Sequence, residues 1–142
     1  MDVNRFVTAH EKSYLHAFNE LSAGKKSSHW MWYIFPQIAG LGFSPTAEYY
    51  AIKNIEEAKA YMQHPILQAH MIELCSILLE INTNDAHKVF GYPDNLKLHS
   101  SMTLFAIACP GYDVFQLILN KYFEGNKDKN TIDIIDEMKN VR

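Results

Sequence analysis

A chain of 142 residues fits a single domain, because folding at this length buries roughly 68–70% of the surface that the unfolded chain exposes. Apolar residues make up 48% of the chain and charged residues 20%, which excludes a disordered, collagen-like or low-complexity protein. With 13 basic and 16 acidic residues, the net charge of −3 does not favour bulk nucleic acid as a partner.

The N-terminal part of the chain predicts two helices. Apolar residues recur at three- and four-residue steps from Val3 to Leu21, which indicates an amphipathic helix with Asp2 as its N-cap. The apolar run 29–35 fits a buried strand as well as a buried helix, and we favour a helix because its neighbours are helical. Pro36 ends this run.

Capping residues mark the starts of several later helices. Ser44 followed by Pro45 opens a helix over 46–51, and Asn54 with Glu57 forms a capping box for the next one. The further segments are 55–63, 65–81, a short turn over 84–90, a helix from 94 toward 109, 114–123 and, after the polar loop 126–130, 131–138. The sequence therefore predicts an all-α fold, a compact orthogonal bundle of six to eight helices in a single domain over residues 1–142.

Several classes of site and location are not favoured. Cys75 and Cys109 lack the spacing of a zinc site or redox motif, and we expect both to be reduced core thiols. We interpret Lys25 and Lys26 as solvated surface. A basic N-terminal segment leading into an apolar run is missing, as is a stretch near the ~18 apolar residues of a membrane span. We expect a cytoplasmic protein with no membrane partner.

Aromatic residues crowd the segment from 30 to 50. One interpretation is a corner of the core, since these rings bury large areas. The other is a stacking platform for a flat base or sugar, beside a glycine loop that allows close approach of a ligand. The candidate ligand-binding residues here are Trp30, Trp32, Phe35, Gln37, Gly40, Gly42, Ser44 and Tyr50.

Two titratable residues in this part of the chain are candidate catalytic groups. His29 is either a general acid–base, a capping group or a surface residue, and no second ligand follows at helical spacing, so no metal is predicted. Glu48 is either a surface carboxylate or, in an apolar pocket, a group that activates water or stabilises an oxocarbenium ion.

A second polar cluster begins near residue 94. Asp94, Lys97 and Ser101 share one helical face at three- and four-residue spacing. The cluster is either a surface ion pair with a capping aspartate or an anion-binding helix start, in which backbone N–H groups and Lys97 meet phosphate. The candidate ligand-binding residues here are Asp94, Lys97, Ser100 and Ser101.

The sequence HWMWYIFPQ over 29–37, continuing to Gly40, Gly42 and Ser44, resembles the uncharacterised family called domain of unknown function 1810. The string KLHSSMTLF over 97–105 resembles the second motif of that family, and the resemblance extends over essentially the whole chain. It implies a small, mostly helical, bacterial-type protein.

A shorter stretch, PTAEYY over 45–50, is similar to the Pro-Thr-Ser-Glu-His-Tyr segment of the NADAR family, which is associated with NAD and ADP-ribose chemistry. The residues that follow, 51–54, depart from the pattern of that family. This resemblance implies a position for Glu48 at the reacting end of a substrate.

Three functional hypotheses follow. The first is a small hydrolase for a nucleotide-like or ADP-ribose-derived N-glycosidic substrate, with Glu48 as the reacting group, aromatic ring walls and phosphate contacts around Lys97. The second is a non-catalytic module that recognises a metabolite or peptide through the same aromatic groove. The third is a purely structural role for both motifs. We expect a small-molecule ligand and no cofactor, and both functional hypotheses require the two motifs to meet in space.

Overall fold

The computed structural model describes residues 1–140, and within them the chain forms nine helices. The predicted all-α class is confirmed, with one helix more than the expected maximum of eight. The helices are α1 (Asn4–Ser22), α2 (Met31–Ile34), α3 (Pro45–Tyr50), α4 (Ile55–Gln63), α5 (Pro65–Glu80), α6 (Ala86–Phe90), α7 (Asp94–Ala108), α8 (Val114–Phe123) and α9 (Lys129–Asn140).

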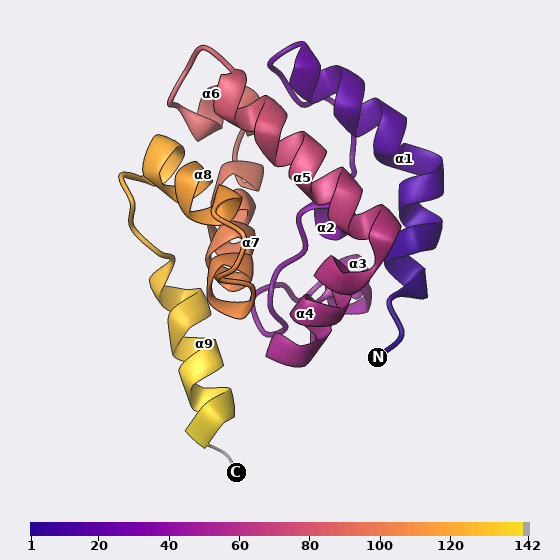
Figure 1. Cartoon of the computed structure of the whole chain (residues 1–142), viewed down its shortest axis with the longest axis vertical. Coiled ribbons are helices and arrows are strands. Elements are labelled where there is room, and N and C mark those ends of the chain that lie inside the picture. The colour runs from indigo at the N-terminus through magenta and orange to yellow at the C-terminus, as the bar shows by residue number, and fades with distance from the viewer. Residues whose placement is uncertain (141–142) are drawn as a thin grey trace.

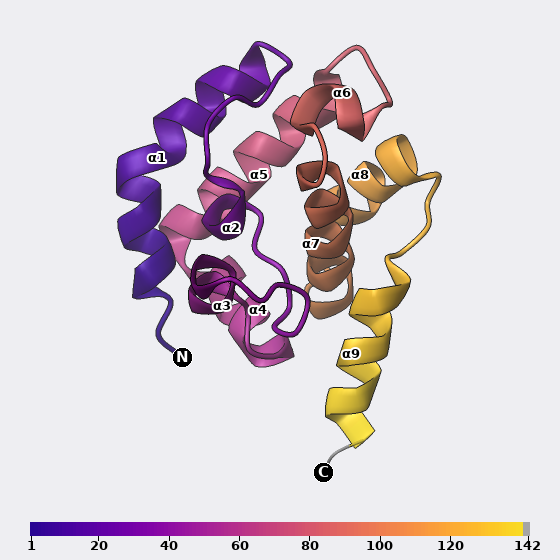
Figure 2. The same cartoon turned by 180° about the vertical axis from the view of Figure 1, so that it is seen from behind.

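Helix α5 runs diagonally across the molecule, with α1 on one side and α7 and α8 on the other (Figures 1 and 2). Helix α7 packs against α4, α6, α8 and α9. One hydrophobic cluster draws buried side chains from eight of the described helices, and Tyr50 of α3 packs against its edge. The largest of its fully buried side chains are Trp30, Tyr61, Phe6, Phe35, Phe105 and Phe115. Both cysteines are buried thiols, as predicted.

Most of the predicted helix starts are correct. The Ser44 hydroxyl accepts a hydrogen bond from the N–H of Ala47, and the Asn54 side chain accepts one from the N–H of Glu57. The predicted N-cap of α1 is wrong by one residue. Val3 occupies the N-cap position, while the Asp2 carboxylate accepts from the N–H of Asn4.

Two predicted boundaries also differ. The run 29–35 is helical, as favoured, but only Met31–Ile34 form the helix, a single turn. Helix α9 begins at Lys129, inside the predicted polar loop. Its early start follows from the Asp128 carboxylate, which accepts from both the N–H and the hydroxyl of Thr131 and so caps the first turn.

Contacts on both sides of α3 hold the second half of the aromatic segment in place. A single parallel bridge joins Ile38 to Ile52, on either side of α3. The Arg5 guanidinium donates to the carbonyl oxygens of Tyr49 and Ala51 at 2.8 Å each and pairs with the buried Glu57 carboxylate at 2.9 Å. These contacts fix α3 and its flanking loops against α1 and α4. Within residues 1–140, no helix is both long and apolar enough to cross a membrane.

Candidate ligand-binding site

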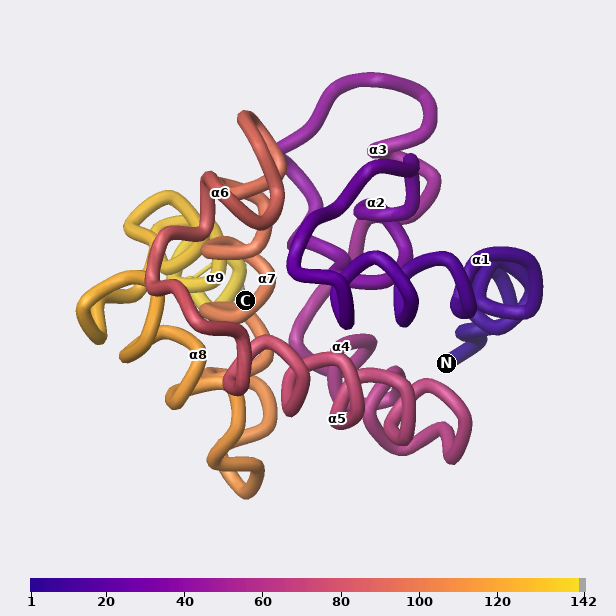
Figure 3. Tube along the Cα trace, turned by 90° about the horizontal axis from the view of Figure 1, so that it is seen from above, coloured from indigo at the N-terminus to yellow at the C-terminus, as the bar shows by residue number. Residues whose placement is uncertain are grey.

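The aromatic motif and the polar motif meet at one hollow of about 350 Å³. Seen from above, α2 and the loop after it lie on the same side of the molecule as α6 (Figure 3). The Lys97 ammonium lies 5.2 Å from the centre of the Trp32 ring, which joins the two motifs directly. The lining residues are Lys26, Ser27, Ser28, His29, Met31, Trp32, Phe90, Tyr92, Pro93, Asp94 and Lys97.

In this hollow, the carboxylate of Asp94 lies between two ammonium groups, those of Lys26 and Lys97. One oxygen of Asp94 lies 2.7 Å from Lys26 Nζ, and the other lies 3.2 Å from Lys97 Nζ. Lys26 also donates to the carbonyl oxygen of Ser28, and its side chain is only 6% exposed. The interpretation of Lys26 as solvated surface is therefore wrong, because the ammonium group is held inside the site.

At the start of α7, side chains rather than backbone N–H groups are available to a ligand in the hollow. The N–H of Asn95 donates to the carbonyl oxygen of Gly91, and those of Leu96 and Lys97 donate to that of Pro93. These three donors of the first turn already have partners. Recognition of an anion here consequently depends on the lysine side chains rather than on a helix N-terminus.

Glu20, at the end of α1, anchors the wall of the hollow that carries Ser28 and Trp32. Its carboxylate accepts from the N–H groups of Ser27 and Ser28 and, at 2.9 Å, from the indole N–H of Trp30. Burial alone would raise the pKa of Glu20, but these hydrogen bonds together outweigh it and lower the pKa to about 2. Sequence reasoning missed Glu20 because its partners lie beyond the end of its helix.

Of the three aromatic residues predicted to form the walls of the site, one lines the hollow and two lie in the core. Trp32 is half-buried and lines the hollow. Trp30 and Phe35 are at most 1% exposed and pack around Phe90. They support the site from behind, because no ring face remains open to a ligand.

A second, much smaller cavity adjoins the hollow behind Trp32 and Lys97. Its volume is about 10 Å³, the space of about one water molecule. Gln37, Gly42 and Tyr50 line it. These predicted ligand residues lie next to the hollow but enclose no room for a ligand of their own.

The two predicted catalytic residues lie in different places. His29 is exposed and lines the Trp32–Lys97 hollow. Glu48 is also exposed, but it lines a separate hollow of about 330 Å³ with Arg5 and Lys53. The structure thus groups His29, and not Glu48, with the aromatic and lysine side chains.

The remaining predicted ligand residues have structural contacts. Gly40 adopts φ 105°, a left-handed conformation that favours glycine, and Ser44 caps α3. Ser100 donates to the carbonyl oxygen of Leu96 and lies 3.2 Å from the Asp128 carboxylate. Ser101 is fully buried, and its hydroxyl has no partner among the described residues. None of these four lines the hollow.

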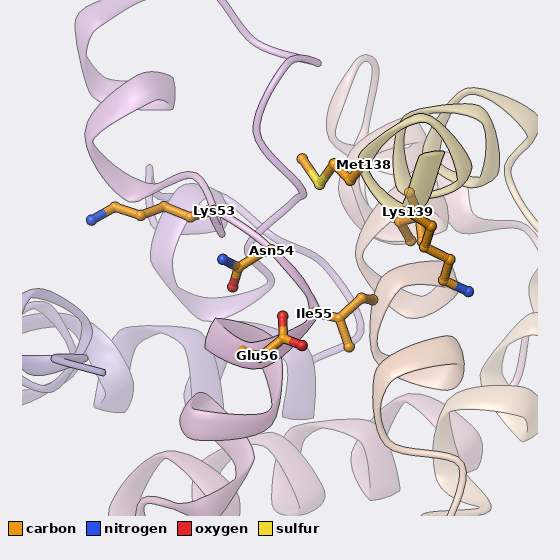
Figure 4. A pocket seen from close by; sticks show the side chains of 7 residues that line it. Lys53, Asn54, Ile55, Glu56, Met138 and Lys139 are labelled. Atoms are coloured by element: carbon orange, nitrogen blue, oxygen red, sulfur yellow. The ribbon is translucent and has the colours of Figure 1, made fainter. Parts of the chain in front are cut away.

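Another hollow, of about 630 Å³, lies between α4 and α9 (Figure 4). Its apolar side chains are Ile55, Ile135 and Met138. The side chains of Lys53 and Lys139 extend away from each other, so its charged groups do not converge on one ligand position. Within residues 1–140, no three His, Cys, Asp or Glu side chains are grouped so that they could hold a metal ion.

Comparison with known proteins gives a family and a fold. A family described as "Protein of unknown function (DUF1810)" matches residues 1–135. The crystal structure of the conserved hypothetical protein Rv1873 from Mycobacterium tuberculosis is similar, with a TM-score of 0.92 and 42% sequence identity, covering 95% of this chain and 96% of that chain. A search of curated proteins finds no match. The weaker resemblance to the NADAR family stays a prediction.

Proposed function

The chain belongs to the DUF1810 family, whose function is unknown, and from the geometry of its site we propose that it binds a small anionic ligand with a planar ring. A nucleotide is the model for such a ligand. The observation that carries the proposal is the position of the Lys97 ammonium, which lies over the Trp32 ring and lines the same hollow. An aromatic ring and a cation therefore line the same hollow.

The size and chemistry of the hollow support a metabolite rather than an extended peptide. Its volume of about 350 Å³ falls within the ~300–1,000 Å³ of small-molecule sites. Stacking of a base on an aromatic side chain is worth about 1–3 kcal/mol. Tyr92, which is 74% exposed, offers a second ring to the same hollow.

Binding without catalysis is better supported than hydrolysis of an N-glycosidic bond. A general base must come within hydrogen-bond reach of the water or proton on which it acts. Glu48, the proposed reacting group of the hydrolase, lines the separate hollow beside Arg5 and Lys53. His29 is the candidate catalytic residue that lines the Trp32–Lys97 hollow.

Ligand binding is tested by thermal unfolding in the presence of NAD, ADP-ribose, AMP, adenosine and nicotinamide. At a hundredfold excess over the Kd, binding to the folded state adds about 2.7 kcal/mol of stability, worth several degrees in Tm. We expect AMP to raise Tm, and the increase to disappear in Trp32→Ala and Lys97→Ala. Glu48→Gln is the control and retains the increase. A flat response to the whole panel contradicts the proposal.

A separate assay of product release tests the hydrolase hypothesis. Wild-type protein is incubated with NAD and with ADP-ribose, and nicotinamide released from NAD or adenine released from ADP-ribose is measured by chromatography. We expect no turnover. Product formation that is lost in Glu48→Gln but retained in Lys97→Ala would instead assign catalysis to the hollow beside Arg5.

A further inference from the structure

The Asp94 carboxylate occupies the position between two ammonium groups that an anionic group of a ligand would take. Its two oxygens lie 2.7 Å from Lys26 Nζ and 3.2 Å from Lys97 Nζ. Hydrogen bonds between charged partners are roughly twice as strong as neutral ones, so this carboxylate competes directly with any phosphate in the hollow.

The two lysines differ in how firmly they are held. Lys26 is 6% exposed and donates to both Asp94 and the carbonyl oxygen of Ser28. Lys97 is 26% exposed. It forms an ion pair with Asp94, and this contact is longer than the one between Lys26 and Asp94. An incoming anion can therefore reach Lys97, whereas Lys26 stays with Asp94.

We propose that the Asp94 carboxylate competes with the ligand for Lys97 and so determines how many anionic groups the ligand can carry. This inference rests on the proposed function of the hollow as a ligand site. A phosphate or carboxylate group of the ligand replaces Asp94 at Lys97, while Asp94 remains paired with Lys26. Because Asp94 stays beside the bound anion, the site accepts a ligand with one anionic group and disfavours a polyanion such as a diphosphate.

The test uses inorganic phosphate and inorganic pyrophosphate as probes. Binding is followed by tryptophan fluorescence, since the Lys97 ammonium lies 5.2 Å from the Trp32 ring and an anion bound to Lys97 changes the charge beside that ring. We expect Asp94→Asn, which keeps the shape of the side chain, to bind pyrophosphate about tenfold more tightly than wild type, equivalent to about 1.4 kcal/mol. The gain for phosphate is smaller, and Lys97→Gln in the Asp94→Asn background abolishes both.

The matched control is Asp133→Asn on α9. It makes the same change in net charge at an exposed ion pair, in which Asp133 lies 2.8 Å from Lys129. We expect no change in pyrophosphate affinity. An equal gain in Asp133→Asn and Asp94→Asn, or no gain in Asp94→Asn, overturns the inference.

Asp94→Asn removes a partner of the buried Lys26 ammonium, so folding is checked by circular dichroism. If that variant is unfolded, the double variant Lys26→Met with Asp94→Asn removes the buried pair as a unit and is measured in its place. We expect its pyrophosphate affinity also to exceed that of wild type, and unchanged affinity overturns the inference.

Failure of this inference and failure of the proposed function give different results. If AMP binds wild type through Trp32 but Asp94→Asn binds pyrophosphate no better, the competitor role alone is wrong. If pyrophosphate affinity rises in Asp94→Asn while no ligand of the nucleotide panel binds any variant, the planar-ring ligand is wrong and the role of Asp94 stands.

Discussion

The indole N–H of Trp30 donates to a carboxylate oxygen of Glu20 at 2.9 Å. The same carboxylate holds the backbone of Ser27 and Ser28, so one side chain at the end of α1 fixes the segment between α1 and α2. Trp30 thereby connects the core to the wall of the hollow, and Trp32, two residues later, presents its ring to that hollow.

We predict that Glu20→Gln weakens both the fold and the ligand site. The neutral amide loses the charge-assisted hydrogen bonds, a loss of about 1–3 kcal/mol in the free energy of unfolding. Urea unfolding measures this loss, and Glu11→Gln, an exposed position on α1, is the control. Equal stability of the two variants would show that the contacts of Glu20 contribute little.

The pKa of Glu20, lowered to about 2, predicts a stability change in acid. The unfolded chain takes up this proton near pH 4.5, whereas the folded protein resists it until about pH 2. The stabilisation is thus complete above pH 4.5 and is lost as the pH falls toward 2. Urea unfolding at pH 5 and pH 3 should show a smaller difference in stability for Glu20→Gln than for wild type.

Local signals made most of the fold predictable from the sequence. Ser44 and Asn54 cap helices through partners three residues away, and such contacts are encoded in adjacent sequence. For the apolar run 29–35, only the helical neighbouring segments favoured a helix over a strand. An apolar run by itself has no periodicity that separates the two.

The site was less predictable because its decisive contacts are long-range. The buried Lys26 pairs with Asp94, 68 positions later in the chain, and no local pattern marks that pairing. Trp30 and Trp32 look equivalent in sequence, yet one enters the core and the other lines the hollow. Ser100 resembled a phosphate contact, but its hydroxyl lies beside Asp128 at the start of α9.

We predict that Gly42→Ala destabilises the loop before α3. A Cβ atom at Gly42 would lie 2.6 Å from the Cβ of Ala47, so the loop or the helix has to shift. Overpacking of this kind typically lowers the free energy of unfolding by about 1–3 kcal/mol. Gly111→Ala is the control, since a Cβ there meets nothing within 4 Å. Equal Tm values for the two variants would contradict this steric argument.

We predict a larger loss of stability for Glu57→Gln. Glu57 is buried, and its carboxylate pairs with Arg5 and accepts from the N–H of Lys53. Removing one partner of a buried ion pair typically lowers the free energy of unfolding by about 3–5 kcal/mol, because the other charge stays without compensation. Glu56→Gln, exposed on the same helix, should have little effect in urea unfolding. A small loss in both variants would mean that water reaches the Arg5 guanidinium.

The buried His10 predicts a second dependence of stability on pH. Its Nε2 lies 2.9 Å from the carbonyl oxygen of Tyr33, which can only accept, so Nε2 carries the proton and Nδ1 accepts from Nδ1 of His70 at 2.9 Å. A second proton on His10 would turn Nδ1 from an acceptor into a donor, so the contact would persist only if His70 carried its own proton on Nε2. Burial, opposed by the hydrogen bond to Tyr33 and aided by the nearby His70 and His64, lowers the pKa of His10 to about 4.

The unfolded chain binds the proton of His10 near pH 6.5 and the folded protein only near pH 4, so this stabilisation is present above pH 6.5 and is lost between these values. We expect wild type to lose up to about 3 kcal/mol from this group between pH 7 and pH 4. Urea unfolding across this range measures the loss. His10→Gln should flatten the profile, whereas His16→Gln, at an exposed position on the same helix, should leave it unchanged. A profile with the same slope in His10→Gln would assign the pH dependence to other groups, with His70 first because burial also lowers its pKa.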